Sequence, residues 1–319
     1  MNFKKIGVIL SSLTLMLSLA SCGTKEVKTD EANKNSQEAR VVKHAMGTTE
    51  LKGSPERIVI LTNEGTEALL ALGVKPVGAV KSWTGIPWYK HIEKEMENVA
   101  NVGLESQVNL EEIAALKPDL IIGNKMRQEK IYDQLSLIAP TVFSETLRGD
   151  WKENFKFYAE VLDKTEEGNK LLSDFDNRIK DISATAGDKL NTKISIVRFM
   201  AGKTRIYFGD TFSGKIFKQI GFARPESQQS DEFAEEIGKE RLKEADGDVI
   251  FYFTYDEGNG EANSREQDWL NDPLFKNLNA VKNKKVFKVD DVIWNTAGGI
   301  RAANLMLDDI EKFLKNNSL

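Results

Sequence analysis

A long helical stretch near the middle of the chain limits the folds that this sequence can adopt. Within residues 164–188, Leu172, Phe175, Ile179 and Ile182 recur every three or four residues, which is the period of an amphipathic helix with a narrow apolar stripe. The stretch has none of the Gly/Ser-rich composition of a flexible linker. If it joins two folded parts, it does so as a rod, and we do not expect large hinge bending.

Short apolar runs alternate with helical segments on both sides of this stretch. Such alternation favours a mostly parallel sheet flanked by helices. The sequence therefore predicts an α/β fold with one lobe over 51–163 and a second over 189–319. The predicted strands are 57–61, 76–80, 118–123, 141–143, 193–199, 205–208, 248–252 and 285–289. The predicted helices outside 164–188 are 64–72, 110–116, 127–137, 151–162, 213–220 and 302–314.

A faint internal repeat indicates that the two lobes are related. Residues 108–122 can be laid over residues 238–250, with Glu111 and Glu240 at matching places. In both segments the acidic residue opens a short helix, which leads through an Asp-containing turn into a buried strand. The period is far longer than that of a solenoid, so the pattern favours a duplicated lobe, with chance similarity as the alternative.

The N-terminus has the pattern of an export signal. Lys4 and Lys5 precede a largely apolar stretch, 6–20, which is too short to span a bilayer comfortably. The stretch ends in Leu-Ala-Ser-Cys22, which resembles the lipobox of bacterial lipoproteins, where the cysteine thiol carries a diacylglycerol. Two acyl chains give a stable anchor, whereas one would be marginal. We therefore predict a signal peptide over 1–21, lipidation at Cys22 and a flexible tether over 22–50. A plain signal peptide with a chance cysteine is the alternative.

Composition narrows the functional classes. With two His and one Cys in 319 residues, a disulfide framework is impossible and a zinc site built from these residues is nearly so. A formal net charge of -5 gives no basic excess for nucleic-acid binding. The sequence lacks a Gly-x-Ser-x-Gly elbow and a His-Glu-x-x-His pair, which disfavours an enzyme. Residues 209–216 nearly match a phosphate-binding loop, but Ile216 stands where a hydroxyl would hold magnesium.

Arginine and aromatic residues gather at the ends of the predicted strands, where open α/β sheets bind ligands. Arginine makes bidentate contacts with carboxylates and other oxygen anions, and Trp and Tyr add flat apolar walls with polar tips. Such a set fits an anionic, oxygen-rich ligand of moderate size, without direct ligation of a bare metal ion. The predicted ligand-binding residues are Trp83, Arg127, Arg148, Arg198, Arg205, Tyr207, Tyr252, Tyr255, Trp294 and Arg301. For Tyr207 and Tyr252, a place in the core is the alternative.

Several motifs together point to a family. They are the lipobox, Pro55-Glu-Arg-Ile-Val59, Leu72-Gly-Val-Lys-Pro-Val-Gly78, Asn109-Leu-Glu111, Leu116-Lys-Pro-Asp-Leu-Ile-Ile122 and Trp294-Asn-Thr-Ala-Gly-Gly-Ile300. In this combination the chain resembles the substrate-binding lipoproteins of iron-siderophore ABC importers, in the wider iron/cobalamin binding-protein family. The resemblance implies two Rossmann-like α/β lobes joined by a single long rigid helix, with the ligand cleft between the lobes.

The resemblance also implies partners for the chain. A glutamate of each lobe would dock on arginines of the permease, and by motif position these are Glu111 and Glu240. The alternative is that acidic residues opening a helix simply favour the helix dipole. The chain would be a monomer anchored at the outer face of the cytoplasmic membrane, with no nucleic-acid partner and no resident cofactor.

The implied function is a receptor that binds a ferric siderophore and delivers it to an ABC permease, without catalysis. The arginines favour a carboxylate or mixed citrate–hydroxamate chelate, although catecholate members often use basic clefts too. Heme or cobalamin binding by the same fold is the alternative. An exported hydrolase using carboxylates, or an adhesin, would represent a different class.

Overall fold

The computed structural model describes residues 39–147, 149–316 and 319. The predicted signal peptide, most of the tether, the lipidation site Cys22 and the predicted ligand residue Arg148 lie outside these residues. No helix in the described part of the chain combines the length and the hydropathy that a bilayer crossing needs.

Five parallel strands form the sheet of the N-terminal lobe, in the order β5-β4-β3-β8-β9. β3, β8 and β9 are buried along their whole length, as expected for a parallel sheet that is covered on both faces. The strands are β3 (Ile58–Ile60), β4 (Gly78–Ala79), β5 (Ala100–Asn101), β8 (Leu120–Asn124) and β9 (Thr141–Ser144). A small separate hairpin joins β6 (Gly103–Leu104) and β7 (Gln107–Val108).

Side-chain caps begin two helices of this lobe. The Thr62 hydroxyl accepts a hydrogen bond from the backbone of α1, and the Asn109 side chain accepts two from α2. The helix expected over 127–137 is instead divided into three short segments, α3, η1 and α4. The bounds are α1 (Asn63–Ala71), α2 (Leu110–Ala115), α3 (Lys125–Gln128), η1 (Glu129–Ile131), α4 (Tyr132–Ser136) and α5 (Trp151–Val161).

The expected tether is too long at its C-terminal end. β1 (Ala39–His44) and β2 (Gly47–Lys52) pair as an antiparallel hairpin, so residues 39–50 are folded. Val42 and Leu51 point inward and are buried, while most of the other hairpin side chains are exposed. Two inward-facing residues in a polar stretch make too weak an alternation to be recognised in the sequence, which is why the hairpin was missed.

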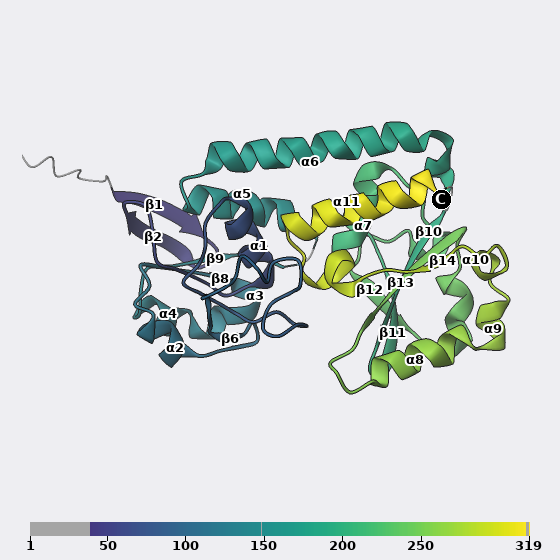
Figure 1. Ribbon diagram of the computed structural model, residues 1–319, viewed down its shortest axis with the longest axis horizontal. Helices are drawn as coiled ribbons and strands as arrows, with labels where there is room; N and C mark the ends of the chain where they lie inside the picture. Colours follow the sequence, from purple (N-terminus) through teal and green to yellow (C-terminus); the bar gives the residue numbers. More distant parts are fainter. Residues whose placement is uncertain (1–38, 148, 317–318) are drawn as a thin grey trace, which may run out of the picture. The chain divides into compact units, whose positions relative to one another are not determined.

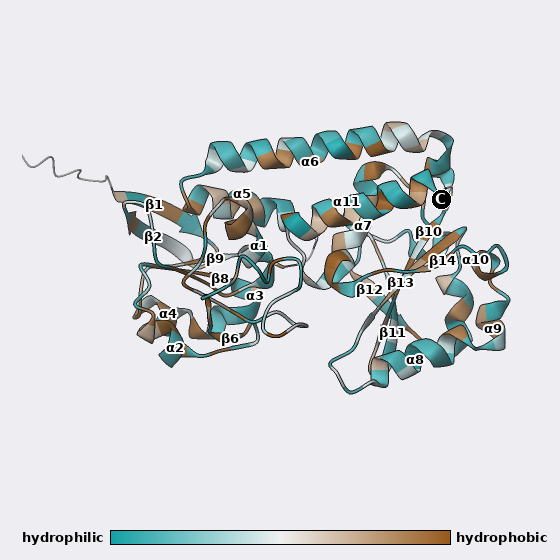
Figure 2. Cartoon of the chain, in the orientation of Figure 1, coloured by the Kyte–Doolittle hydropathy of each residue, from teal (hydrophilic) through white to brown (hydrophobic). Residues whose placement is uncertain are grey.

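α6 (Thr165–Ala186) is the single long helix that the central stretch predicts, and it begins with Lys164 at the N-cap. Its apolar stripe is buried at Leu172, Phe175 and Ile179, as expected. The helix packs on α5 of the N-terminal lobe, and on α7 (Phe212–Ile220) and α11 (Ile300–Lys315) of the C-terminal lobe (Figure 1). Figure 2 shows that the rest of the helix is largely hydrophilic. The two-lobed α/β fold with one connecting helix is therefore confirmed.

The sheet of the C-terminal lobe is mixed, which differs from the expected mostly parallel arrangement. Its order is β12-β11-β10-β13-β14, with β11 antiparallel to both of its neighbours. A tight turn at Gly202 joins β10 to β11 and leaves no room for the crossover that a parallel pair needs. The strands are β10 (Ile194–Met200), β11 (Lys203–Tyr207), β12 (Ala234–Ile237), β13 (Val249–Tyr255) and β14 (Val286–Lys288).

The helices of the C-terminal lobe complete a core that is shared with the other lobe. A single buried cluster includes Ile60 and Phe155 of the N-terminal lobe together with Phe251 and Trp294. α11 also packs directly on α1. The helical segments are η2 (Gly187–Asn191), α7 (Phe212–Ile220), η3 (Glu226–Gln228), η4 (Lys239–Ala245), α8 (Glu261–Leu270), α9 (Pro273–Lys276), α10 (Asn279–Lys282), η5 (Val292–Thr296) and α11 (Ile300–Lys315).

Candidate functional site

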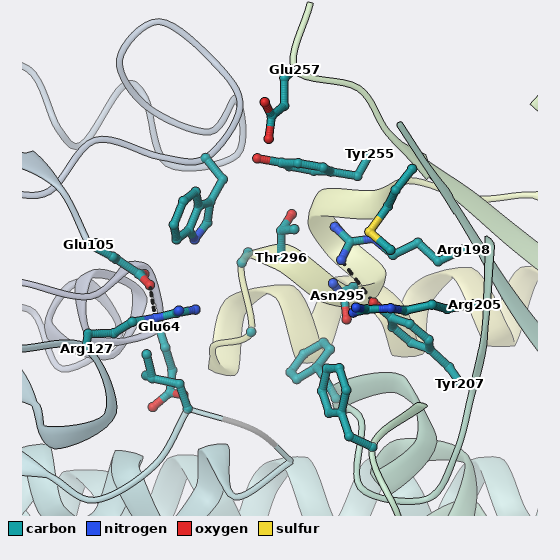
Figure 3. A pocket seen from close by; sticks show the side chains of 17 residues that line it. Glu64, Glu105, Arg127, Arg198, Arg205, Tyr207, Tyr255, Glu257, Asn295 and Thr296 are labelled. Atoms are coloured by element: carbon teal, nitrogen blue, oxygen red, sulfur yellow. Dashed lines mark hydrogen bonds and ion pairs between the residues drawn. The ribbon is translucent and has the colours of Figure 1, made fainter. Parts of the chain in front are cut away.

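A cavity of about 440 Å³ is lined by residues of both lobes. This volume lies within the usual range for small-molecule sites, about 300–1,000 Å³. Figure 3 shows its polar side chains facing one another from the two lobes. The lining residues are Glu64, Trp83, Glu105, Arg127, Leu147, Arg198, Met200, Arg205, Tyr207, Phe212, Phe233, Tyr255, Glu257, Asn295, Thr296, Ala297 and Gly298. In the described ranges no group of three or more His, Cys, Asp and Glu side chains is arranged to hold a metal ion.

The cavity brings together a majority of the predicted ligand residues. They come from loops and strands of both lobes, as the strand-end argument expects. Those that line it are Trp83, Arg127, Arg198, Arg205, Tyr207 and Tyr255.

Arg198 is the most tightly held arginine of the cavity. It lies on β10, is 8% exposed, and donates from Nε and Nη2 to the two carboxylate oxygens of Asp291 at 2.7 and 3.1 Å. Its Nη1 donates to the Tyr207 hydroxyl at 2.9 Å, and its guanidinium carbon lies 4.9 Å from the centroid of the Tyr255 ring. Three of the five N–H groups of an arginine are thus used. The other two are not engaged by any of these partners and can serve a ligand.

Burial and hydrogen bonding both act on the pKa values of the groups in this network. Burial raises the pKa of the Asp291 carboxyl, while the Arg198 charge and its hydrogen bonds act in the opposite direction. Burial also raises the pKa of the Tyr207 hydroxyl, so this group stays protonated. Thr296 donates a further hydrogen bond to Asp291 at 3.0 Å, which ties η5 to the same carboxylate. The C-terminal wall is therefore built before any ligand arrives.

Arg127 of α3 is the corresponding group on the N-terminal wall. Its Nε lies 3.4 Å from Oε2 of Glu105 (Figure 3). Its guanidinium carbon lies 5.6 Å from the centroid of a Trp83 ring. Glu105 is itself buried, and its other oxygen accepts hydrogen bonds from the backbone and side chain of Asn63 at 2.6 and 2.8 Å. The arginine is more exposed than the carboxylate that holds it.

Glu64 of α1 adds a buried acid to the same wall. Burial raises the pKa of its carboxyl well above the ordinary value, the nearby charges of Glu105 and Glu67 add to this, and hydrogen bonds from Asn154 and Tyr158 oppose it. Its Oε1 has no hydrogen-bond partner among the described residues. Burial therefore keeps the Glu64 carboxyl protonated to a higher pH than an exposed glutamate.

Two predicted aromatic residues do not reach the cavity. Tyr252 lies in the core of the C-terminal lobe, where its ring packs on Phe199 and its hydroxyl contacts Glu266. Side chains alternate along a strand, so Tyr252 and Tyr255 of β13 face opposite sides of the sheet. Trp294 is fully buried, with its ring centroid 4.8 Å from that of Phe251. Placing these two residues in the site was therefore wrong.

The predicted residue Arg301 also lies elsewhere. It is on α11 and donates to the backbone oxygen of Leu70 at 2.9 Å, and it forms an ion pair with Glu95. The neighbouring Ala302 N–H donates to the buried carboxylate of Glu67 at 2.9 Å. These contacts join the two lobes. Arg301 is therefore a structural residue of the lobe junction, and its assignment to the ligand site is corrected.

Comparison with known proteins assigns the family. Residues 58–293 match the family described as periplasmic binding protein. The chain belongs to this family. Its members are named as binding proteins, in agreement with the prediction that this chain is not an enzyme.

Three similar proteins are informative. The chain is 50% identical to the probable siderophore-binding lipoprotein YfiY of Bacillus subtilis, in an alignment that covers 97% of this chain and 98% of that one. It is 29% identical to the Fe(3+)-citrate-binding protein YfmC of the same organism, covering 98% of each chain. Among solved structures, it is similar to Staphylococcus aureus SirA complexed with staphyloferrin B. That likeness has a TM-score of 0.81 and 37% identity, covering 86% of this chain and 98% of SirA.

Sequence reasoning missed the acidic and amide residues of the cavity. Glu105 lies in the turn between β6 and β7, and nothing in the neighbouring sequence distinguishes this buried acid from acids on the surface. Asn295 and Thr296 fall within the motif 294–300 that contributes to the resemblance, but the strand-end argument selected the neighbouring Trp294 instead. The missed polar residues are Glu64, Glu105, Glu257, Asn295 and Thr296.

The two glutamates of the repeat lie outside the cavity. Glu111 is exposed in the first turn of α2, and Glu240 is exposed in η4 of the other lobe. Each lobe thus presents one of them to solvent near the start of a helical segment. Their role as docking groups stays a prediction.

Proposed function

We propose that this chain is an extracytoplasmic receptor that binds a ferric siderophore in the cavity between its lobes and delivers it to an ABC permease. The observation that carries this proposal is the pair of facing walls, each with arginine beside an aromatic ring. On one wall Arg127 lies near Trp83, and on the other Arg198 lies near Tyr255.

A carboxylate or mixed citrate–hydroxamate chelate fits these walls best. The two N–H groups of Arg198 that its partners among the described residues do not use can donate to oxygens that the iron already polarises. The more exposed Arg127 and Arg205 can do the same. Trp83 and Tyr255 can cover the apolar backbone of the chelator. SirA, a similar protein, is complexed with staphyloferrin B, and YfmC is named for Fe(3+)-citrate, which supports this choice of ligand.

The proposal includes a lipid anchor at Cys22, at the outer face of the cytoplasmic membrane. The export signal and the lipobox-like sequence before Cys22 support it. The relative YfiY is named a lipoprotein, which supports it further. We propose that the anchored chain acts as a monomer.

Docking on the permease is assigned to Glu111 and Glu240. We expect the double variant Glu111→Ala with Glu240→Ala to lose iron uptake in cells while its ligand affinity is unchanged, because neither residue lines the cavity. A double variant of the equally exposed Glu112→Ala and Glu261→Ala is the matched control, and it should transport normally. Lost ligand affinity in the first variant would contradict the docking role.

A titration followed by tryptophan fluorescence tests the ligand. Trp83 lines the cavity, so a ferric chelate that binds there should quench its emission in a saturable way. Nanomolar affinity corresponds to about -12 kcal/mol, which is within reach of several charge-assisted contacts and aromatic burial. The panel contains a ferric citrate–hydroxamate, a ferric tris-catecholate, heme and cobalamin. Saturable quenching by heme or cobalamin alone would overturn the proposal.

Two variants check that the signal comes from the cavity. Trp83→Phe should remove most of the quenching. Arg205→Gln should weaken chelate binding, whereas the matched Arg265→Gln on α8, away from the cavity, should not.

A further inference from the structure

Each arginine that lines the cavity in the described part of the chain has a carboxylate beside it. Arg127 has Glu105 at 3.4 Å, and Arg198 has Asp291 at 2.7 Å. Arg205 has Glu236 at 4.0 Å, its partner across the pair of strands β11 and β12. Figure 3 shows the first of these pairs at the cavity wall.

The pairs differ in their exposure to water. The side chains of Glu105 and Asp291 are 4% and 7% exposed, whereas that of Glu236 is 57% exposed. Solvent screens a charge at an exposed site much more than at a buried one. Water therefore screens the charges of the two buried carboxylates much less than it screens the charge of Glu236.

A buried carboxylate has two effects on a ligand that approaches the arginine. It restrains the guanidinium: Asp291 receives two hydrogen bonds from Arg198 and fixes its orientation, whereas Glu105, itself fixed by Asn63, restrains Arg127 through one ion pair. It also repels any negative charge that the arginine attracts. The arginine keeps its directed N–H groups but attracts a highly charged anion less strongly.

We propose that Glu105 and Asp291 are positioning residues that make the site select ferric chelates of low net negative charge. This inference rests on the proposed function and specifies which chelates the site takes. A ferric citrate–hydroxamate has the required combination of oxygen acceptors and small net charge. A ferric tris-catecholate, in which the catecholate charges far exceed that of the iron, does not.

The test compares the affinities for these two chelates in the full chain and its variants. Wild type should bind the citrate–hydroxamate chelate more tightly than the tris-catecholate. Glu105→Gln and Asp291→Asn remove a negative charge at nearly constant volume. In each variant, binding of the tris-catecholate should improve about tenfold relative to binding of the citrate–hydroxamate chelate. This is the lower end of the coupling measured for close charge pairs at interfaces. Glu236→Gln is the matched control, and its shift should be clearly smaller because of its exposure.

The ratio separates charge selection from a merely structural role. A variant that only loosens the wall would weaken binding of both chelates and leave their ratio unchanged. In Glu105→Gln the remaining oxygen can still accept the hydrogen bonds of Asn63, so this variant keeps the test decisive even if Asp291→Asn folds poorly. Raising the salt concentration should weaken tris-catecholate binding more steeply in both variants than in wild type.

Two results would overturn the inference. One is a wild-type preference for the tris-catecholate, and the other is an unchanged ratio in Glu105→Gln. Either result would leave the proposed function standing, because a ferric chelate would still bind. If wild type bound neither chelate but bound heme or cobalamin, both the proposed function and this inference would fall.

Discussion

The two walls of the cavity hold their arginines in different ways. On the C-terminal wall Arg198 is buried, and Asp291, Tyr207 and the Tyr255 ring fix it. On the N-terminal wall the side chain of Arg127 is 38% exposed, and among the described residues it pairs with Glu105 and lies near a Trp83 ring. A fixed group loses little conformational entropy when a ligand binds, whereas a mobile one loses more. We infer that the C-terminal wall provides orientation and that the N-terminal wall adapts.

The difference has its origin in the elements that carry the residues. Arg198 lies within β10, the central strand of its sheet, directly opposite Arg205 of β11. Arg127 lies in α3, a helix of four residues that directly follows β8. A central strand is held by hydrogen bonds on both sides, and so short a helix is held by few. Variants of single residues can therefore test whether the two walls differ in rigidity.

Arg198→Ala should have the largest effect. It leaves the buried Asp291 carboxylate without its partner, and removing one partner of a buried ion pair costs about 3–5 kcal/mol of folding free energy. Ligand affinity should fall by about a hundredfold or more, as for other buried charge-assisted contacts. Chemical denaturation and fluorescence titration measure the two losses. A change in unfolding free energy below about 1 kcal/mol would contradict the view that this wall is prebuilt.

Arg198→Lys is the informative control for that variant. It keeps the positive charge near Asp291 but lacks the planar fork that makes two parallel hydrogen bonds. Stability should recover in part, while affinity should stay well below that of wild type. Full recovery of affinity would show that charge alone matters at this position and not orientation.

The sequence was sufficient for the fold because the signals of the fold are local. The apolar stripe of α6, the Asn109 cap and the apolar strands each lie within one short window. General rules of α/β topology then limit how these elements can be arranged in space. The hairpin over 39–52 and the turn at Gly202 escaped because each depends on a few residues rather than on a repeated pattern.

The site was harder to predict because its geometry depends on contacts between distant residues. Arg198 and Asp291 are 93 positions apart, and no local pattern links them. Tyr252 and Tyr255 have identical side chains, and only the alternation of side chains along β13 decides which of them faces the cavity. The sequence identified residue types suited to an oxygen-rich anion, but the carboxylates that modify the arginines became visible only in three dimensions.

Glu64→Gln should have the second largest effect, seen in the pH dependence of stability. Because the folded-state pKa of Glu64 is raised, the folded protein binds a proton that the unfolded chain releases above the ordinary pKa of 4.5. The free energy of unfolding should therefore fall as the pH rises from that value toward the raised pKa. The fall is larger the further apart the folded-state and unfolded-state pKa values of Glu64 lie. Glutamine has no proton to lose, so the variant should show a smaller fall.

Denaturation curves at about pH 5 and about pH 8 measure this difference between the variant and wild type. Glu112→Gln, at an exposed position of α2, is the matched control and should follow wild type. Equal pH dependence in Glu64→Gln and wild type would show that Glu64 is ionised in the folded protein. The N-terminal wall would then carry two negative charges beside Arg127 and would be less suited to an anionic ligand.

Arg127→Ala should have the smallest effect on folding and thus defines the contrast between the walls. The side chain is partly exposed, and Asn63 still donates two hydrogen bonds to the buried Glu105, so the free energy of unfolding should fall by clearly less than the ~3–5 kcal/mol expected for Arg198→Ala. Ligand affinity should fall by about tenfold, or about 1.4 kcal/mol, because one charge-assisted contact is lost. If Arg127→Ala destabilised the fold as strongly as Arg198→Ala, both walls would be prebuilt. A loss of affinity without a comparable loss of stability would instead show that the N-terminal wall adapts to the ligand. Arg127 would then contribute through contacts that form only when the ligand is present.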